Sequence, residues 1–291
     1  MRIFIRKFLS KILSKELKSK VKEFEYKSKK QLISKLPTLD EENLRDVLIN
    51  ELGIKKGDNL FIHASMDMIN TMLSPLQILE MILNIVGEDG SISVPTFIRY
   101  SSKEWMEMDK QFDTTRTPSG MGVFSERVRR HKLAKRSLHP TKSVSTIGDI
   151  ADKVLNEHHS DIYQFGLSSP FVKLLDYDLK VIGLGAPMSY LSMVHTVEDV
   201  YPAEYPKKIN EDVIYEKVCI GKNKEEKLVN TLVHDLKVIT KANPEKFVKK
   251  YMNKDNYVIY THYLTPFFMI KGKGLFTELE KQMRLGNTIY D

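Results

Sequence analysis

A histidine and a carboxylate, His195 and Glu198, stand three residues apart in a stretch that reads as helical. Residues at this spacing share one face of a helix, so Glu198 can accept a hydrogen bond from one imidazole nitrogen and leave the other basic. Such a pair suits removal of a proton from an amine or from water. The alternative is an ordinary ion pair on a solvated helix face, which the same spacing also produces.

Cationic and hydroxyl side chains crowd residues 136–143, which read Arg-Ser-Leu-His-Pro-Thr-Lys-Ser. Its donors include Arg136, Ser137, His139 and Ser143. Donors of this kind suit phosphate groups or an amide-rich chain such as pantetheine, because both offer several oxygen acceptors. A polar surface loop would have the same composition, so the stretch is only a candidate binding loop.

Two further polar residues, Asp113 and Ser119, precede that loop. Asp113 is a candidate contact for an amine or hydroxyl, or else the acceptor of an Asx turn. Ser119 is predicted to cap a helix over residues 123–131, whose first amides would suit an anion or a polarised carbonyl. An ordinary helix cap is the alternative for Ser119.

The elements that must position these residues begin with a strand–helix–strand unit. Apolar runs at 59–63 and 91–95 predict buried strands, and a segment that opens with proline predicts a helix over 75–86. This spacing favours a sheet with parallel pairs. His63 and Ser65 then stand at the carboxyl end of the first strand, where α/β sheets usually bind ligands. A structural histidine is the alternative for His63.

The remaining elements follow from apolar spacing and turn residues. A capping box at Thr38 predicts a helix that ends at Leu52. Further helices are predicted over residues 123–131, 147–158, 171–175, 189–200, 224–240 and 275–285, and further strands over 180–185, 211–220 and 257–263. The strand over 180–185 ends in two glycines, where backbone can approach a ligand closely, but the full dinucleotide-binding pattern is absent.

The composition is that of a soluble globular protein, with 42% apolar and 29% charged residues among 291. This length suits one large α/β domain or two small ones. Cys219 is the only cysteine, which excludes an intrachain disulfide and a cysteine-rich zinc site and fits a reducing cytoplasm. No run of about 18 apolar residues predicts a spanning helix. Lys7 and Lys11 make the N-terminal stretch a poor signal peptide, so we expect a cytoplasmic protein.

The net charge of +7 comes from one end of the chain. Residues 1–37 hold 12 Lys and Arg against 3 Glu, a net of +9, so residues 38–291 hold 33 basic against 35 acidic side chains, a net of −2. Because the body is near neutral, we expect no nucleic-acid partner.

Residues 1–27 read as a basic amphipathic helix, with apolar residues at spacings of three and four and Lys or Arg on the other face. Such a helix can lie on an anionic membrane surface. Alternatively, it packs on the domain or on a second subunit, and the frequency of symmetric homodimers favours a dimer. Residues 28–37 then serve as a tether to a domain over residues 38–291.

Taken in order, six motifs resemble the aminoglycoside 3-N-acetyltransferase family. Each motif is common by itself, and the resemblance, which spans roughly residues 39–285, depends on their order and gaps. The motifs are Gly57-Asp58 with His63-Ala64-Ser65, Val94-Pro95-Thr96, Phe112-Asp113 with Thr117-Pro118-Ser119 and Gly122, Arg136-Ser137 with His139-Pro140, Ser169-Pro170, and His195 with Glu198.

This resemblance implies a single α/β domain with a central mixed, partly parallel sheet flanked by helices, unrelated to the GNAT acetyltransferase fold. It also implies acetyl-CoA or another acyl-CoA as co-substrate, an amino group as acceptor, and no metal. Carried over residue by residue, His195 is the general base and Glu198 its partner. The residues implied for CoA and its thioester are His63, Ser65, Thr96, Arg136, Ser137 and Ser143, and those implied for the acceptor are Asp113, Ser119, His139 and Ser169. Backbone amides near Thr96 or Ser137 are candidate oxyanion donors.

The chain departs from the family pattern where His63-Ala64-Ser65-Met66 replaces the usual His-Ser-Ser-Leu. An aminoglycoside carries several positive charges, and a body of −2 offers it little attraction. We therefore predict an amino sugar on a nucleotide carrier as acceptor, of the kind used in surface-polysaccharide synthesis. An aminoglycoside acceptor, with antibiotic resistance, is the first alternative. A non-catalytic, membrane-associated scaffold is the second, and the presence of both His195 and Glu198 argues against it.

If residues 1–27 bind a membrane surface, the full chain should co-sediment with vesicles of anionic lipid, whereas a chain of residues 38–291 should stay in the supernatant. Each Lys or Arg near the headgroups contributes about 1 kcal/mol, so sedimentation should also weaken as salt is raised. Equal sedimentation of both chains would contradict the hypothesis.

Overall fold

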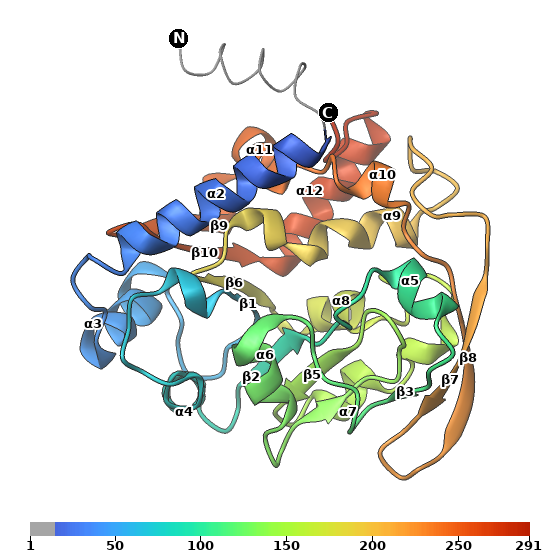
Figure 1. Cartoon of the computed structure of the whole chain (residues 1–291), viewed down its shortest axis with the longest axis horizontal. Coiled ribbons are helices and arrows are strands. Elements are labelled where there is room, and N and C mark those ends of the chain that lie inside the picture. The colour runs from blue at the N-terminus through green and yellow to red at the C-terminus, as the bar shows by residue number, and fades with distance from the viewer. Residues whose placement is uncertain (1–14) are drawn as a thin grey trace.

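The computed structural model describes the backbone of residues 15–291 and the side chains from residue 20 onward, apart from residue 22. Its framework is a seven-stranded sheet in the order β4-β5-β2-β1-β6-β10-β9 (Figure 1). The strands are β1 (Asn59–Ala64), β2 (Ser91–Pro95), β4 (Lys135–Arg136), β5 (Val144–Ile147), β6 (Lys180–Leu184), β9 (Tyr257–His262) and β10 (Thr265–Lys271).

The centre of this sheet is parallel and its flanks are antiparallel. β1 pairs in parallel with β2 and β6, while β5 and β10 run antiparallel to them. The predicted strand–helix–strand unit is confirmed, because α4 (Pro75–Val86) connects β1 to β2 and begins with a capping box of Ser74 and Gln77. The parallel strands end at one edge of the sheet, which places His63, Ser65 and Thr96 at that edge.

Helices pack on both faces of the sheet. Besides α4, the α-helices of the described chain are α2 (Lys15–Ile33), α3 (Glu41–Asp46), α5 (Ser102–Glu107), α6 (Gly122–Arg129), α7 (Ala151–Leu155), α8 (Pro170–Lys173), α9 (Thr196–Val200), α10 (Leu236–Ile239), α11 (Pro244–Tyr251) and α12 (Gly272–Arg284), and those that cover the two faces are named with the cores below. A π-helical segment, Val47–Glu51, continues α3, and 3-10 turns occupy Met66–Met68, His158–Ser160, Leu174–Tyr177, Met188–Tyr190, Ser192–His195 and Lys254–Asn256.

Two apolar cores lie on opposite faces of the sheet because strand side chains alternate between the faces. Leu60 and Ile62 of β1 pack with α3, α4 and α6, whereas Phe61 packs with α7, α8, α9, α11 and α12. This arrangement confirms the predicted α/β class with a mixed, partly parallel central sheet.

A small second sheet stands beside the first and consists of β3 (Phe112–Asp113), β7 (Tyr215–Ile220) and β8 (Glu226–Thr231). Its core holds Trp105, Phe112 and Cys219. Burial raises the pKa of the Cys219 thiol to about 12, so this side chain stays protonated and serves as packing.

The helix predicted over residues 224–240 is wrong. The segment turns back at Lys224, forms β8 against β7, and becomes helical only in α10. Pairing with β7 buries Val229 and leaves Leu228 61% exposed. Burial therefore alternates from one residue to the next, as in a strand, and does not follow the spacing of three and four residues that is typical of a helix.

Two other predicted helices are shorter or broken, and a third has a different N-cap. Residue Ile147 belongs to β5, so the helix predicted from that residue starts at Ala151. The helix predicted over 189–200 consists of two 3-10 turns followed by α9. Asp40, and not Thr38, caps α3 by accepting a hydrogen bond from the Asn43 amide.

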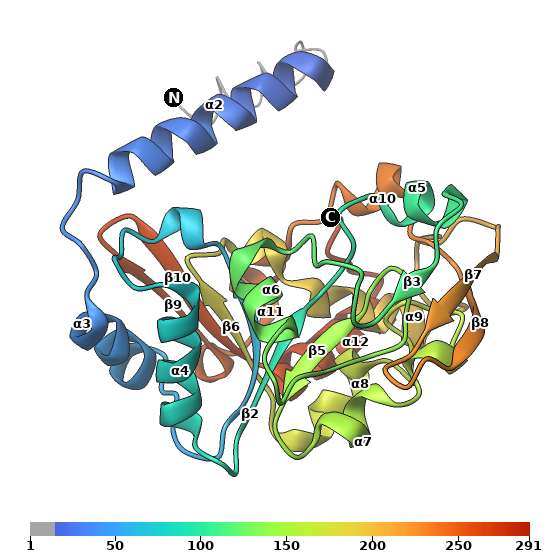
Figure 2. The same ribbon diagram turned by 60° about the horizontal axis from the view of Figure 1, so that its bottom comes forward.

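The helix α2 extends over the body as an arm (Figure 2). It runs through Ile33, so the predicted tether is wrong for residues 28–33, because no glycine or proline interrupts the helix before Pro37. Lys30 pairs with Asp67 at 2.8 Å, while Phe24 is 71% exposed. Part of the segment 1–27 lies outside the described residues, so its membrane contact stays a prediction.

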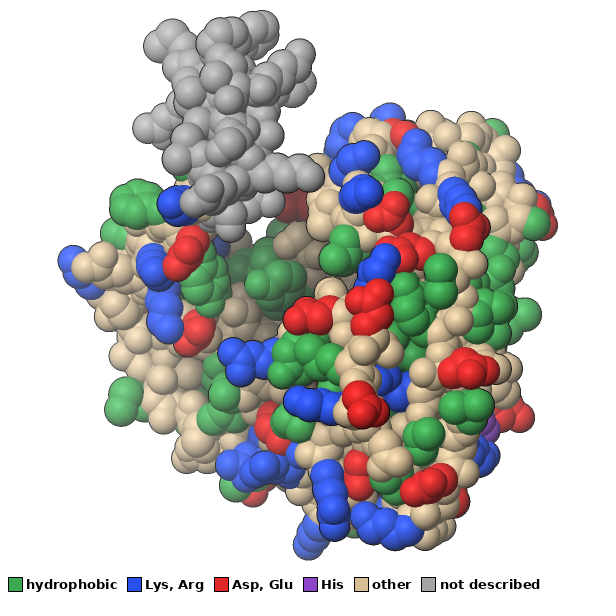
Figure 3. Space-filling view, turned by 45° about the vertical axis from the view of Figure 1, so that its right-hand side comes forward, with side chains coloured by type: hydrophobic (Ala, Val, Ile, Leu, Met, Phe, Trp, Pro, Cys, Tyr) green, Lys and Arg blue, Asp and Glu red, His purple; other side chains and the backbone are tan. Residues whose placement is uncertain are grey.

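Figure 3 shows one face of the molecule, where Lys and Arg side chains mix with Asp and Glu and a recess contains hydrophobic side chains.

No helix among the described residues is long and apolar enough to cross a membrane.

Candidate active site

His195 and Glu198 meet where the 3-10 turn Ser192–His195 joins α9. His195 Nδ1 lies 2.8 Å from Oε2 of Glu198, although the two residues belong to different helical segments. The Glu198 side chain is fully buried, whereas that of His195 is 17% exposed. With the Nδ1 proton donated to the carboxylate, Nε2 is the basic nitrogen of this pair.

The next residue, Asp199, holds a second histidine beside the first. Asp199 Oδ2 lies 3.1 Å from His234 Nε2 and accepts a 2.9 Å hydrogen bond from the Phe165 amide. Burial acts to raise the pKa of Asp199, but His234 and the hydrogen-bond donors outweigh it and lower that pKa. The His195 ring lies 5.3 Å from the His234 ring and 5.5 Å from the Phe165 ring, so both rings hold the imidazole in place.

Two tyrosines, Tyr205 and Tyr290, lie close to Glu198. Burial and the Glu198 charge raise the pKa of both phenols, so they stay protonated. Glu198 Oε1 is buried and has no hydrogen-bond partner among the described residues. Within the part of the chain that the structure describes, the short hydrogen bond of this carboxylate therefore goes to His195.

A cleft of about 500 Å³ opens at the carboxyl ends of β1 and β2, and neither His195 nor Glu198 is among its lining residues. His63 lines it and places Nε2 3.4 Å from both the amide nitrogen and Oγ of Ser192, the first residue of the turn that carries His195. Phe97 lines it as well and packs on Phe165 at 6.4 Å. Two residues of the cleft wall thus contact Ser192 and Phe165, which are neighbours of His195.

The start of α6 forms another wall of the cleft. Gly120 and Gly122 line both this cleft and a neighbouring groove of about 500 Å³. A Cβ at Gly120 would lie 2.5 Å from the Arg99 Cα, so glycine is needed for this backbone approach. Ser125 also lines the cleft, and its buried Oγ has no partner among the described residues. The helix N-terminus and this hydroxyl together favour an anion or a carbonyl oxygen.

The neighbouring groove is basic, with Arg99, Arg127 and Arg130 in its walls. Arg130 pairs with Glu126 at 2.8 Å, whereas Arg99 and Arg127 are exposed and form no ion pair within the described chain. Because the groove shares glycines with the cleft, an extended ligand could occupy both.

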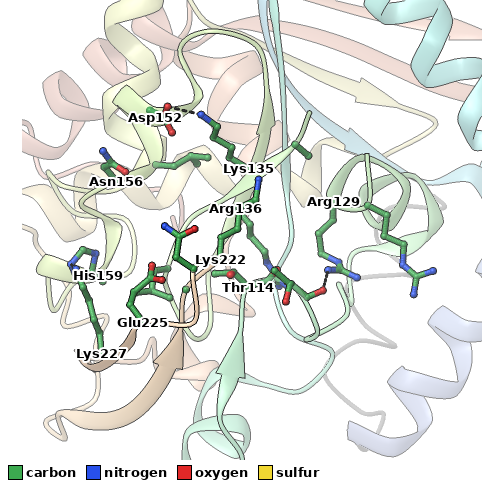
Figure 4. A pocket seen from close by; sticks show the side chains of 17 residues that line it. Thr114, Arg129, Lys135, Arg136, Asp152, Asn156, His159, Lys222, Glu225 and Lys227 are labelled. Carbon is green, nitrogen blue, oxygen red and sulfur yellow. Dashed lines mark hydrogen bonds and ion pairs between the residues drawn. The ribbon is translucent and has the colours of Figure 1, made fainter. Parts of the chain in front are cut away.

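Arg130 also lines a third pocket, of about 540 Å³, near β4 (Figure 4). This pocket is basic as well, but Lys135 pairs with Asp152 at 2.5 Å and Arg129 with Glu126 at 2.7 Å. Its lining includes neither His63 nor Phe97, the two residues that connect the first cleft to the surroundings of His195.

Arg136 forms hydrogen bonds with residues of three separate segments near the cleft and the third pocket. Its guanidinium donates to the carbonyl oxygens of Thr96 and Thr117, at 2.6 and 2.5 Å, and to Oγ of Ser143 at 3.0 Å. Burial lowers the pKa of Arg136 to about 9. Most of its donors are thus used within the protein, and its contact with CoA stays a prediction.

The loop 136–143 is a buried polar network and not a surface loop. Ser137 Oγ lies 2.9 Å from His158 Nδ1, and the His139 ring stacks on the His158 ring at 4.3 Å. Both Ser137 and His139 are almost fully buried. In this structure they support the loop instead of facing the cleft.

Thr96 and Ser143 are likewise buried, with their hydroxyl oxygens 3.3 Å apart. The Thr96 amide donates to the Ser143 carbonyl, and the Ser137 amide donates to the Val144 carbonyl, each at 2.9 Å. These two amides, which we named as oxyanion donors, are therefore occupied by hydrogen bonds around β5.

The predicted acceptor contacts lie elsewhere or are buried. Asp113 forms an Asx turn, accepting from the amides of Thr115 and Arg116 at 2.8 and 3.0 Å. Ser119 Oγ accepts from the Met121 amide, so it braces the turn before α6 without capping the helix. Ser169 is fully buried, and its Oγ has no partner among the described residues.

His195, Glu198 and His234 also have the spacing of a metal site, with donor atoms within 4.8 Å of one another. Two of these three are already bonded to carboxylates, His195 to Glu198 and His234 to Asp199. Because Glu198 Oε2 and His195 Nδ1 bond to each other, these two residues form a proton-transfer pair.

Sequence reasoning missed Asp199, His234, Phe165 and Ser125. The consecutive acids at 198 and 199 were a signal that a second partner was needed. His234 and Phe165 gave none, because they reach the site only through the fold.

The free energy of unfolding should depend on pH because three histidines, His63, His139 and His158, are buried. Burial lowers the pKa of His63 and of His158 to about 3, and lowers that of His139 well below its usual value. As pH falls from 6.5 towards 3, the unfolded chain takes up protons that the folded chain does not, so stability falls.

Urea unfolding at a series of pH values should therefore show a steep decline below pH 6.5. Each histidine contributes up to about 1.4 kcal/mol per pH unit. His158→Gln should reduce this slope, and His262→Gln, at the edge strand β9, should not. Equal slopes for the wild type and His158→Gln would contradict this account.

The family model for aminoglycoside 3-N-acetyltransferase matches residues 61–262. Among curated proteins, the chain is 28% identical to the aminoglycoside N(3')-acetyltransferase-like protein YokD of Bacillus subtilis, over 56% of this chain and 65% of that protein. It is 28% identical to aminoglycoside N(3)-acetyltransferase III of Pseudomonas aeruginosa, over 50% of this chain and 59% of that one. The matches thus span less than two thirds of the length of these relatives.

Solved structures show the same fold. The chain aligns with aminoglycoside acetyltransferase AAC(3)-Xa at a TM-score of 0.72 and 19% identity, over 91% of this chain and 98% of that one. It aligns with AAC-IIIb, solved with CoASH, at a TM-score of 0.69 and 19% identity, over 85% of this chain and 97% of the other. With most of its sheet and both members of the histidine–glutamate pair inside the matched region, the chain belongs to the aminoglycoside 3-N-acetyltransferase family.

Proposed function

We propose that this chain transfers an acetyl group from acetyl-CoA to an amino group of an aminoglycoside-type amino sugar. The observation that carries the proposal is the buried Glu198 bonded to a partly exposed His195, together with a cleft of about 500 Å³ whose wall residues His63 and Phe97 contact neighbours of His195. Relatives with this fold were solved with sisomicin and with a gentamicin, so amino sugars are ligands known for the fold.

The pair supplies the base that the reaction needs. His195 Nε2 takes a proton from the acceptor amine as its nitrogen attacks the thioester carbon, and Glu198 stabilises the imidazolium that forms. The carbon–sulfur bond then breaks, and the CoA thiolate takes the proton back from His195. The neutral imidazole is restored, and the products are the amide and CoA.

The cleft and the adjoining basic groove offer a path for the CoA. The thioester end would lie between His63, Ser65 and Ser125, and the phosphates would follow the start of α6 towards Arg99 and Arg127. Of the other residues implied by the family resemblance, Thr96, Arg136, Ser137 and Ser143 would act by holding these walls.

A nucleotide-linked amino sugar is the second candidate acceptor, and one observation favours it. Asp67 is the single acidic residue among the described residues that line the cleft, and Lys30 already pairs with it at 2.8 Å. A polycation finds little attraction there, whereas a less cationic sugar needs none.

The base assignment predicts that His195→Ala loses about 10²–10⁴-fold in kcat for acetyl transfer. Glu198→Gln should lose roughly ten- to hundredfold, because a charge-assisted hydrogen bond is replaced by a neutral one. The measurement is thiol release from acetyl-CoA with a panel of aminoglycosides, amino sugars and nucleotide-linked amino sugars.

The best acceptor in that panel decides between the two candidates. His262→Ala, far along the chain from the pair, is the matched control and should keep wild-type rates. Unchanged turnover in His195→Ala would reject the base assignment, and no turnover with any acceptor would reject the proposed transfer.

The path for the CoA predicts a second effect. Arg99→Ala and Arg127→Ala should each raise KM for acetyl-CoA about tenfold, which is the loss expected for one charge-assisted contact to phosphate. Neither should change KM for acetyl-pantetheine, which lacks the phosphates of the nucleotide. The control is Lys132→Ala, outside the groove. If both thioesters lose equally, the phosphates bind elsewhere.

A further inference from the structure

One cation near the site has no role in the chemistry described so far. Lys142 lies in the loop before β5, and its side chain is half-buried. No hydrogen bond or ion pair joins its ammonium to another described residue, although its backbone amide donates to His139 Nδ1 at 3.1 Å. The ammonium makes a cation–π contact with the Phe97 ring, and its N–H donors have no hydrogen-bond acceptor among the described residues, so they can bind an oxygen of a ligand.

The ammonium lies near two aromatic rings, one that lines the cleft and one that packs on His195. Lys142 Nζ is 4.8 Å from the centroid of the Phe97 ring, which lines the cleft, and 6.0 Å from that of Phe165. Phe165 in turn packs on His195 at 5.5 Å. A thioester that reached from the cleft to His195 would pass Phe97 and Phe165, the two rings that the ammonium approaches.

The reaction needs a group that stabilises the negative charge formed on the thioester oxygen. When the amine attacks, the carbonyl π bond breaks and its electron pair moves to the oxygen, which becomes an oxyanion. The amides of Thr96 and Ser137 are occupied by hydrogen bonds to Ser143 and Val144 and cannot serve it.

We propose that Lys142 is a catalytic residue whose ammonium binds the thioester carbonyl oxygen and stabilises the oxyanion of the tetrahedral intermediate. This inference rests on the proposed acetyl transfer. The lysine gives up no proton in the step: the oxygen's negative charge forms beside it and returns to the carbonyl when the carbon–sulfur bond breaks.

Titration of Lys142 gives the role a pH signature. Burial lowers the pKa of Lys142 to about 8, against the opposing charge of Asp199 on α9. His139 faces it from the same loop and is neutral, because burial lowers its pKa well below the usual value. The ammonium is therefore present below pH 8 and is lost as pH rises above it.

The test compares Lys142→Met with the wild type in the full-length protein. Removal of one oxyanion donor should lower kcat by about 10²–10³-fold, while KM for acetyl-CoA changes little. Wild-type kcat should fall above about pH 8, and this falling limb should be absent from the methionine variant. Lys142→Arg, which keeps its charge at high pH, should retain part of kcat and also lack the limb.

Two outcomes would overturn the role. One is a kcat of Lys142→Met within threefold of the wild type, with the same pH profile. The other is a loss confined to KM, which would make Lys142 a ground-state binding group. Circular dichroism and calorimetric binding of CoA check that each variant is folded and loaded. The proposed function fails separately, if the wild type transfers acetyl to no acceptor in the panel.

Discussion

The site depends on two consecutive buried carboxylates in α9. Glu198 and Asp199 each give up hydration, which costs several kcal/mol for an unpaired charge. Each is compensated by one histidine, His195 at 2.8 Å and His234 at 3.1 Å. Because the two acids are adjacent on a short helix, the two imidazoles are drawn together to 5.3 Å between ring centroids.

Aromatic rings lie between the two buried carboxylate–histidine pairs and the cleft. Phe165 contacts both histidines, and Phe97 links it to the cleft. Rings exclude water without supplying competing hydrogen bonds, so Nε2 of His195 has no hydrogen-bond partner among the described residues. The exposed edge of His195 is thus the point where a deeply buried carboxylate can act on a substrate.

The polar loop 136–143 has a different task from the one its composition suggests. Arg136 donates to the backbone carbonyls of Thr96 and Thr117, and Ser137 is bonded to His158. Buried polar groups must be satisfied, and a network that satisfies all of them also fixes its geometry. The loop therefore sets the end of β2 and the approach to α6, which are walls of the cleft. Lys142 is the one polar residue of the loop whose side chain takes no part in this hydrogen-bond network within the described chain.

The sequence by itself determined the features that depend on residues only a few positions apart in the chain. It placed α4 at its observed bounds, put β1 and β2 in a parallel unit, and aligned His195 with Glu198, because turn residues and side-chain periods act over a few positions. Only the tertiary structure decided that residues 226–231 form a strand, because their apolar spacing fits either period until β7 offers its hydrogen bonds. The tertiary structure also joined Asp199 to His234 and Lys142 to Phe165, since such contacts depend on which elements pack together and leave no trace in spacing along the chain.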